Sequence, residues 1–354
     1  MSIEWMDNFS QYGVDELNML DGLWADRISG GAFGPNLVAD PDGVSGGLVL
    51  NLVSGSMRRV LSTAKTTVGV AFRLWMDQLP ISSNQRYQVL QFTDAVNAEQ
   101  ITLLIETTGV ISAYRGAGTA AGTLLGSTAV PALVAGAWNH IEMKVLFSQT
   151  VGTVGIKVNE VSVLALTGQD TVATALVECS QIKFTGLCYN GDDDECYIKD
   201  VIVWNADGSV NNDFMGDLQV VTIVPTSDDT FAGWTSTGAN GFSVIDETTP
   251  DDADYINAVT PPPAAVVFGL SNLDPDVTVV KGLMTIVRTL KTDAGAANLQ
   301  IGLTSGASTD NGADRPITTA ATYYGDISEL DPNTASAWTR TTVDAAKLRV
   351  NRTT

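Results

Sequence analysis

The chain has 354 residues, 44% of them hydrophobic and 17% charged, which is enough for two domains or for one large domain with an appendage. Its 19 Lys and Arg residues are outnumbered by 40 Asp and Glu residues, so the formal charge is −21. A chain this acidic repels nucleic acids and anionic membrane surfaces, and we expect neither as a partner.

The N-terminal sequence has neither the basic nor the apolar region of a signal peptide. No stretch approaches the roughly 20 apolar residues of a membrane helix. We therefore expect a protein that is made in a cytoplasm and stays soluble. The three cysteines, Cys179, Cys188 and Cys196, match no zinc or redox spacing. They are predicted to be free thiols, with one disulfide and a spare thiol as the alternative.

Strands are predicted through most of the first part of the chain. Apolar and polar residues alternate there with a period of two, which is typical of half-buried strands. The pattern covers the ranges 67–76, 101–105, 141–147, 154–163 and 197–204. Within the fourth range, Asn159-Glu160 predicts a tight hairpin turn.

A domain boundary is indicated at 205–216, where a polar, turn-rich stretch joins two strand-rich regions. We divide the chain there into a first domain, 1–210, and a second domain, 211–354. Short strands separated by turns, with few helices, favour an antiparallel sandwich over a parallel α/β sheet. The predicted fold is therefore all-β, with a β-sandwich followed by a second, smaller β-rich domain.

The second domain has a less regular pattern. A long acidic loop rich in Pro and Thr is expected at 226–263, because Pro261-Pro262-Pro263 at its end cannot join a strand ladder. Strands are expected to resume at 277–290 and at 299–303. In the terminal tail, the segment 343–350 is predicted to form one or two helical turns.

Three stretches carry a resemblance to a known fold. Residues 136–145, GAWNHIEMKV, and residues 155–161, GIKVNEV, resemble the W-x-H-I/V and V-x-V-N/D-G strand pair of concanavalin A-like, laminin-G-like jelly rolls. Glu160 stands where that family has Gly, which leaves the turn type open. Residues 196–204, CYIKDVIVW, resemble the closing strand of the same fold. The resemblance implies a concanavalin A-like jelly roll over about residues 1–210.

The layout of the whole chain is similar to that of tailed-bacteriophage structural proteins. The resemblance rests on MDNFSQYG at 6–13, NDFMGDLQV at 212–220 and the Trp-bearing tail WTRTTVD at 338–344. It implies a non-enzymatic component of a tail, a fibre or a capsid surface, located in the virion after synthesis in the host cytoplasm. It also implies other virion proteins as partners and a homo-oligomer, which would protect the edges of a sandwich.

No catalytic set stands out in the sequence. His140 is the single histidine, and a strand residue beside Trp138 is the simplest interpretation of it. Retaining glycosidases on this fold carry two Glu and one Asp on one strand as E-x-D-x-x-E, a string that the sequence lacks. The fragment Glu329-Leu330-Asp331 is followed by Pro332, which ends a strand. We therefore expect that the protein is not an enzyme.

One metal site is predicted. Asp192, Asp193 and Asp194 form an acidic run whose oxygens could hold Ca²⁺. A solvated hairpin tip explains the same run, since it lacks the spaced ligands of an EF-hand loop. No cofactor other than calcium is expected.

One sugar-binding residue is predicted. Trp75 lies opposite the apolar face of its strand and is the tryptophan expected to be exposed for stacking on a sugar, whereas Trp138 and Trp204 are expected in the core. A carbohydrate-binding module or receptor-binding adhesin, with a host-surface glycan as its partner, is therefore the alternative to a structural role in the virion.

Overall fold

The computed structural model describes residues 1–12, 23–28, 36–41, 48–51, 56–80, 87–118, 121–185, 195–247, 251–258 and 264–354. The chain forms two compact units, of which the first extends to Val220 and the second covers Val221–Thr354 with a few residues near the N-terminus. Residues 211–220, which the sequence assigns to the second domain, lie in the first unit.

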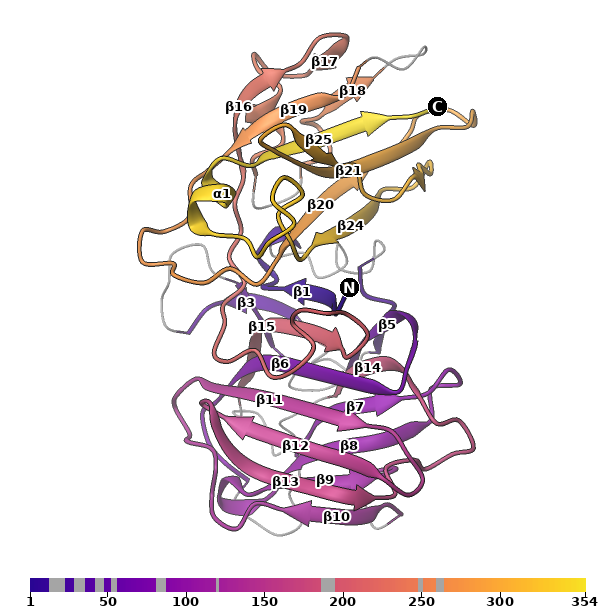
Figure 1. The fold of residues 1–354 in the computed structure, drawn as a ribbon, viewed down its shortest axis with the longest axis vertical. Helices are drawn as coiled ribbons and strands as arrows, with labels where there is room; N and C mark the ends of the chain where they lie inside the picture. Colours follow the sequence, from indigo (N-terminus) through magenta and orange to yellow (C-terminus); the bar gives the residue numbers. More distant parts are fainter. Residues whose placement is uncertain are drawn as a thin grey trace. The chain divides into compact units, whose positions relative to one another are not determined.

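The first unit is a sandwich of two antiparallel sheets (Figure 1). Sheet A has eight strands in the order β13-β12-β11-β6-β15-β4-β3, with β1 paired to β15. Its strands are β1 (Ile3–Asp7), β3 (Asn36–Ala39), β4 (Leu48–Asn51), β6 (Thr67–Met76), β11 (Asn139–Leu146), β12 (Gly152–Val158), β13 (Val161–Gln169) and β15 (Cys196–Asn205).

Sheet B lies against sheet A and has seven strands in the order β10-β9-β8-β7-β14-β5-β2. Short 3-10 helices are found at η1 (Ser10–Tyr12) and η3 (Thr107–Gly109). The strands of sheet B are β2 (Asp26–Ile28), β5 (Ser56–Lys65), β7 (Tyr87–Thr93), β8 (Glu99–Ile105), β9 (Ile111–Arg115), β10 (Thr123–Ser127) and β14 (Cys179–Thr185).

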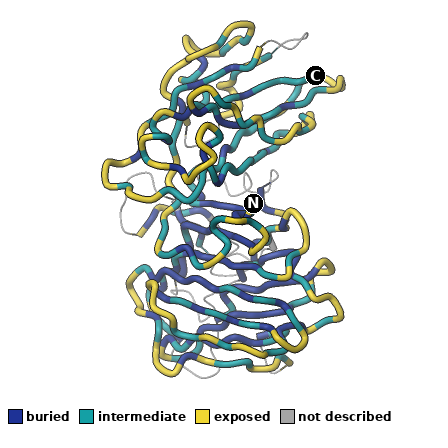
Figure 2. Tube along the Cα trace, in the orientation of Figure 1, coloured by how far each residue is buried: buried dark blue, intermediate teal, exposed yellow. Residues whose placement is uncertain are grey.

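The core of the first unit lies between the two sheets (Figure 2). Alternate residues of β6 point into it, and the rings of Phe72 from sheet A and Phe184 from sheet B meet edge to face at a centroid distance of 5.2 Å. Burial of each such side chain contributes about 1.5–3 kcal/mol. The alternate residues of β6 and β11 therefore divide into a core face and an outer face, and this confirms the predicted sandwich.

Two local features follow from single residues. Asn159 and Glu160 have φ values of 48° and 66°, as a type I′ hairpin turn between β12 and β13 requires, so Glu160 adopts the conformation that Gly would favour. Gly69 leaves room for the indole of Trp204, since a Cβ at position 69 would lie 2.1 Å from Trp204 Cε2. Trp204 is fully buried, as predicted.

The cysteines differ from the prediction. Cys179 is a free and fully buried thiol, whereas Cys196 is disulfide-bonded. The prediction of three free thiols is therefore wrong, because sequence spacing does not report which strand ends the fold brings together. Cys188 lies outside the described residues.

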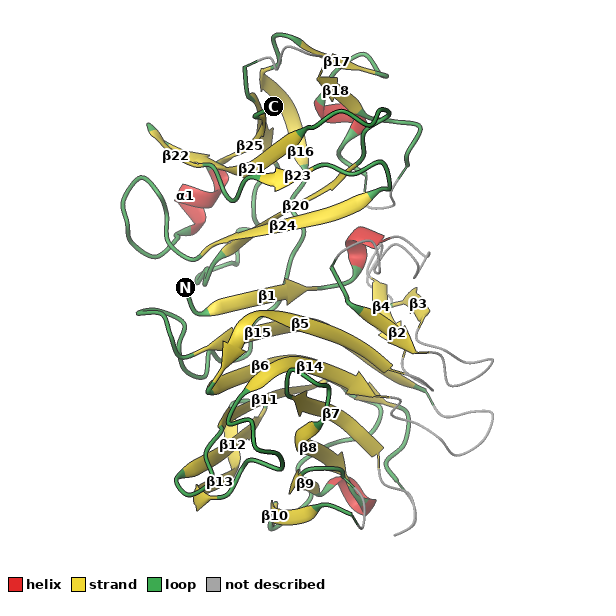
Figure 3. Cartoon of the chain, turned by 90° about the vertical axis from the view of Figure 1, so that its right-hand side faces the viewer, coloured by secondary structure: helices red, strands yellow, loops and turns green. Residues whose placement is uncertain are grey.

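The second unit is also built from antiparallel strands (Figure 3). Its main sheet has six strands in the order β16-β19-β25-β21-β22, with β23 paired to β21, and two further strand pairs are β17-β18 and β20-β24. The elements are β16 (Pro225–Thr230), β17 (Trp234–Ser236), η4 (Phe242–Val244), β18 (Ile256–Ala258), β19 (Val266–Leu270), β20 (Leu283–Thr289), β21 (Asn298–Ser305), β22 (Ser308–Asp310), β23 (Arg315–Pro316), β24 (Thr322–Ser328), α1 (Arg340–Asp344) and β25 (Lys347–Arg352).

The second unit also corrects two expectations. The range 226–263, expected as a long loop, contains the strand pair β17-β18 and most of β16. The segment 343–350, expected as helical turns, contains the end of α1 and most of β25, which lies between β19 and β21. Tertiary pairing explains β25, since it places Val350 in the apolar cluster of this unit beside Phe268 and Ile301.

Within the described residues, none of the helices has the length and apolar character needed to cross a membrane.

Candidate functional site

Trp75 lies on the outer face of sheet A and is half-buried. The strand register pairs it with Tyr197 of β15. The two ring centroids are 5.3 Å apart at an interplanar angle of 33°, which is a tilted aromatic contact. The side chain that the sequence predicts to stack on a sugar is therefore outside the core of the sandwich.

A second tryptophan, Trp138, lies level with Trp75. It directly precedes β11, whose first residue Asn139 pairs with the residue before Trp75. The Nζ atom of Lys199 is 4.2 Å from the centroid of the Trp138 ring. Trp138 is half-buried, so its predicted place in the core is wrong, because Asn139 occupies the buried position at this point. We call Trp75, Trp138 and Tyr197 the aromatic platform.

Two cations lie next to the platform on the same face. Arg73 of β6 pairs in register with Lys199 of β15. Arg73 Nη2 is 2.8 Å from Asp217 Oδ1, and Arg73 Nε is 3.3 Å from Asp200 Oδ2. Lys199 Nζ is 2.5 Å from Asp40 Oδ2. Both cations are therefore held by carboxylates of the chain itself.

Two acidic residues lie next to the platform on the side away from Arg73 and Lys199. Asp77 and Glu195 continue the pairing of β6 with β15, since Asp77 N donates to Glu195 O at 3.1 Å and Glu195 N donates to Asp77 Oδ1 at 3.2 Å. Burial, together with the carboxylates of Glu195 and Asp77, raises the pKa of the Tyr197 phenol. Tyr197 therefore stays protonated at neutral pH.

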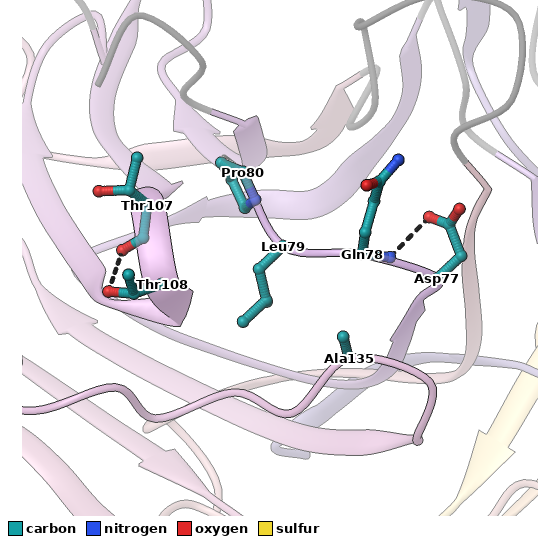
Figure 4. A pocket seen from close by; sticks show the side chains of 7 residues that line it. All are labelled: Asp77, Gln78, Leu79, Pro80, Thr107, Thr108 and Ala135. Atoms are coloured by element: carbon teal, nitrogen blue, oxygen red, sulfur yellow. Dashed lines mark hydrogen bonds between the residues drawn. The ribbon is translucent and has the colours of Figure 1, made fainter. Parts of the chain in front are cut away.

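A shallow hollow of about 370 Å³ lies beyond Asp77, at the same end of the sandwich (Figure 4). Its volume is within the range of small-molecule sites, which is roughly 300–1,000 Å³. The loop before Trp138 is joined to the end of β6 by a hydrogen bond from Gly136 N to Met76 O at 2.7 Å. The hollow is lined by Asp77, Gln78, Leu79, Pro80, Thr107, Thr108 and Ala135.

A buried pair of titratable residues lies further along the outer face. His140 is 2% exposed, and its Nδ1 atom is 3.9 Å from Asp217 Oδ1. Glu142 is fully buried, and its Oε1 atom accepts hydrogen bonds from Met215 N at 2.7 Å and Gly216 N at 3.2 Å. Burial lowers the pKa of His140 and raises the pKa of Glu142. In the sequence, the alternation of apolar and polar residues in β11 already indicates that His140 and Glu142 share the face opposite the core.

The predicted calcium ligands Asp192, Asp193 and Asp194 lie outside the described residues. Within the part of the chain that the structure describes, no group of three His, Cys, Asp or Glu side chains is placed to hold a metal ion.

Neither a family model nor a curated protein matches the chain. Several solved structures are similar to it. A sialidase is 15% identical with a TM-score of 0.40; the match covers 58% of this chain and 19% of that chain. The alginate lyase Aly36B is 13% identical with a TM-score of 0.42, and the match covers 57% of this chain and 95% of that chain.

Domain 4 of AbnA, an extracellular arabinanase from Geobacillus stearothermophilus, is 16% identical with a TM-score of 0.39. That structure contains arabinotriose, and the match covers 57% of this chain and 91% of that chain. At these identities and TM-scores, the likeness assigns no activity and no ligand to this chain. None of the three names belongs to a phage structural protein.

The prediction that the protein is not an enzyme is contradicted by this comparison, since a sialidase, an alginate lyase and an arabinanase are among the similar structures. The prediction rests on the absence of one catalytic motif, and that absence excludes only one kind of active site. A missing E-x-D-x-x-E string rules out one arrangement of carboxylates on one strand. It does not rule out catalytic groups that come from distant positions in the chain. The fold brings such positions together on the outer face, where residues 215–217 contact His140 and Glu142.

Proposed function

We propose that the first unit binds a carbohydrate on the outer face of sheet A, at the aromatic platform. The observation that carries the proposal is the pair of half-buried tryptophans, Trp75 on β6 and Trp138 directly before β11, which lie level with each other. A sugar ring has apolar faces and a rim of hydroxyl groups. An aromatic surface with polar groups beside it complements both features.

The polar groups are supplied from both sides of the platform. The carboxylates of Asp77 and Glu195 accept hydrogen bonds, and the ammonium group of Lys199, one N–H of which is directed to Asp40, has further N–H groups to donate. The hollow beyond Asp77 adds the hydroxyl groups of Thr107 and Thr108. These donors and acceptors match the hydroxyl groups of a sugar without requiring a charged ligand.

The predicted role in a tailed-phage virion rests on the resemblance of the sequence, and it stays a prediction. A host-surface glycan is the partner that this role and the proposed binding site have in common. Calcium dependence also stays a prediction, because its residues lie outside the described part of the chain.

A glycan array with the full chain tests the proposal. Wild-type protein should bind at least one glycan, and Trp75→Ala should weaken that binding about tenfold or more, as loss of a central aromatic contact does. Tyr255→Ala is the matched control, because Tyr255 is an aromatic residue of the second unit that is 52% exposed. A parallel array with EDTA shows whether calcium contributes.

Two results would contradict the proposal. One is that the wild-type chain binds no glycan, with or without calcium. The other is that Trp75→Ala and Tyr255→Ala bind with the affinity of the wild-type chain.

A further inference from the structure

Residues 212–220, which we call the strap, follow β15 and cross the outer face of sheet A (Figure 1). At the start of the strap, Lys144 Nζ is 3.0 Å from Asp213 Oδ1. The ring of Phe214 lies below the Nζ atom of Lys157, 4.5 Å from its centroid, and covers Gly155. A Cβ at position 155 would be 3.0 Å from Phe214 Cζ, so glycine allows this close approach.

The middle of the strap is fixed by a buried carboxylate. Glu142 accepts the backbone N–H groups of Met215 and Gly216, and Met215 is itself 8% exposed. Gly216 has φ of 85°, which a residue with a side chain rarely adopts, so the chain can turn here towards β6.

The end of the strap continues across two more strands. Asp217 pairs with Arg73 of β6, and Val220 N donates to Asp200 Oδ1 of β15 at 3.0 Å. The strap thus contacts β11, β6 and β15 in sheet order. Arg73 is two residues before Trp75 on the same face of β6, so the strap is anchored one side-chain repeat along the strand from the platform.

The platform is also bounded on the side of β12. The turn at Asn159 is level with His140, since His140 N donates to Asn159 Oδ1 at 2.9 Å and Asn159 N donates to His140 O at 2.8 Å. Trp138 comes two residues before His140 and therefore lies beyond the tip of the β12–β13 hairpin. On the opposite side sheet A continues from β15 to β4 at the level of the platform, since Tyr197 pairs with Asn51.

We propose that the strap is a built-in stop that restricts the carbohydrate site to a short oligosaccharide or a chain end. The inference rests on the proposed function. The strap occupies the outer face on one side of the platform, and the hairpin tip ends the sheet on another. A ligand that runs along β6 over the platform meets the strap at Arg73, and the interior of a long polymer has no room to continue under the strap.

The test compares a ligand series on the full chain. Isothermal titration is carried out with the di-, tri- and hexasaccharide of a glycan that the array identifies. For the wild-type chain, the affinity should level off, with the hexasaccharide within about twofold of the trisaccharide, because added sugars make no new contacts. A gain of about tenfold from tri- to hexasaccharide in the wild-type chain would overturn the proposal.

A variant with a weakened strap supplies the second comparison. Phe214→Ala combined with Asp217→Ala removes two anchors but leaves Arg73 paired with Asp200. We expect faster amide hydrogen exchange at Met215 and Gly216, and a hexasaccharide affinity that rises about fivefold above that of the trisaccharide. Asp207→Ala is the control, because it removes an ion pair of equal length, to Lys65, outside the strap.

The outcomes separate the two proposals. If the variant shows faster exchange but keeps the length dependence of the wild-type chain, the strap is not the stop. If no member of the series binds to the wild-type chain or to the variant, the failure is that of the carbohydrate site itself.

Discussion

Single residues of the outer face show how burial and charge interact. His140 and Glu142 are adjacent on one face of β11, and the strap covers both. Burial disfavours the charged form of each residue, so their pKa values move in opposite directions. The sequence predicts which face they occupy. It does not predict their burial, because residues 215–217 come from more than seventy positions further along the chain.

The pKa of Glu142 leads to a prediction on pH dependence. Its folded-state pKa is raised, so Glu142 contributes stability that is fully present below its unfolded-state pKa and is lost as pH rises through the folded-state pKa. The free energy of unfolding of the wild-type chain, relative to Glu142→Gln, should therefore fall as the pH rises above the ordinary pKa of a glutamate, about 4.3. Denaturant titrations at several pH values measure the difference.

Glu178→Gln provides the control for this series, because Glu178 is a half-buried carboxyl group in the same unit. It removes a carboxyl group that does not contact the strap, so it shows the effect of the substitution type alone. A difference between wild type and Glu142→Gln that is constant over the range would contradict the assignment.

Elements of secondary structure were predictable where one face of a strand is buried. The alternation in β6, β11 and β12 follows from a core on one side and polar surroundings on the other. Alternation is too short to predict β25, whose sequence KLRVNR has only two apolar residues, Leu348 and Val350. Pairing with β19 and β21 makes it a strand, and that pairing is a tertiary interaction.

The edge strand β13 leads to a prediction about self-association. Among the described strands it pairs with β12 alone, and its sequence VSVLALTGQ contains no charged residue. Uncharged edges recruit further strands. In sedimentation experiments the wild-type chain should associate as its concentration rises, and Ala165→Lys should weaken this association about tenfold.

Val96→Lys is the control for the edge strand. Val96 is 75% exposed in the turn between β7 and β8, so the added charge lies away from β13. If the wild-type chain stays monomeric at all concentrations, or if Val96→Lys has the same effect as Ala165→Lys, the edge is not the interface.

At the scale of the whole molecule, the boundary between the units depends on the strap. Composition places the boundary in the polar stretch at 205–216, whereas the contacts of Asp213, Met215 and Val220 tie the strap to sheet A. Polar composition therefore marks a segment outside regular strands, but it does not show whether that segment is docked or free.

Two fragments test this boundary. Fragment 1–220 should be more stable than fragment 1–210 by about 2–4 kcal/mol, since the shorter fragment loses the hydrogen bonds to Glu142 and the burial of Met215. Chemical denaturation of both fragments measures the difference. Equal stabilities would mean that the strap adds nothing to the first unit.

The sequence by itself determined the all-β class, the alternation of core and outer faces and the outward position of Trp75, because each follows from the period of a strand. Only the tertiary structure decided the exposure of Trp138, the burial of His140 and Glu142, and the path of the strap. These depend on contacts between residues that are far apart in the chain, and the period of a single strand carries no information about such contacts.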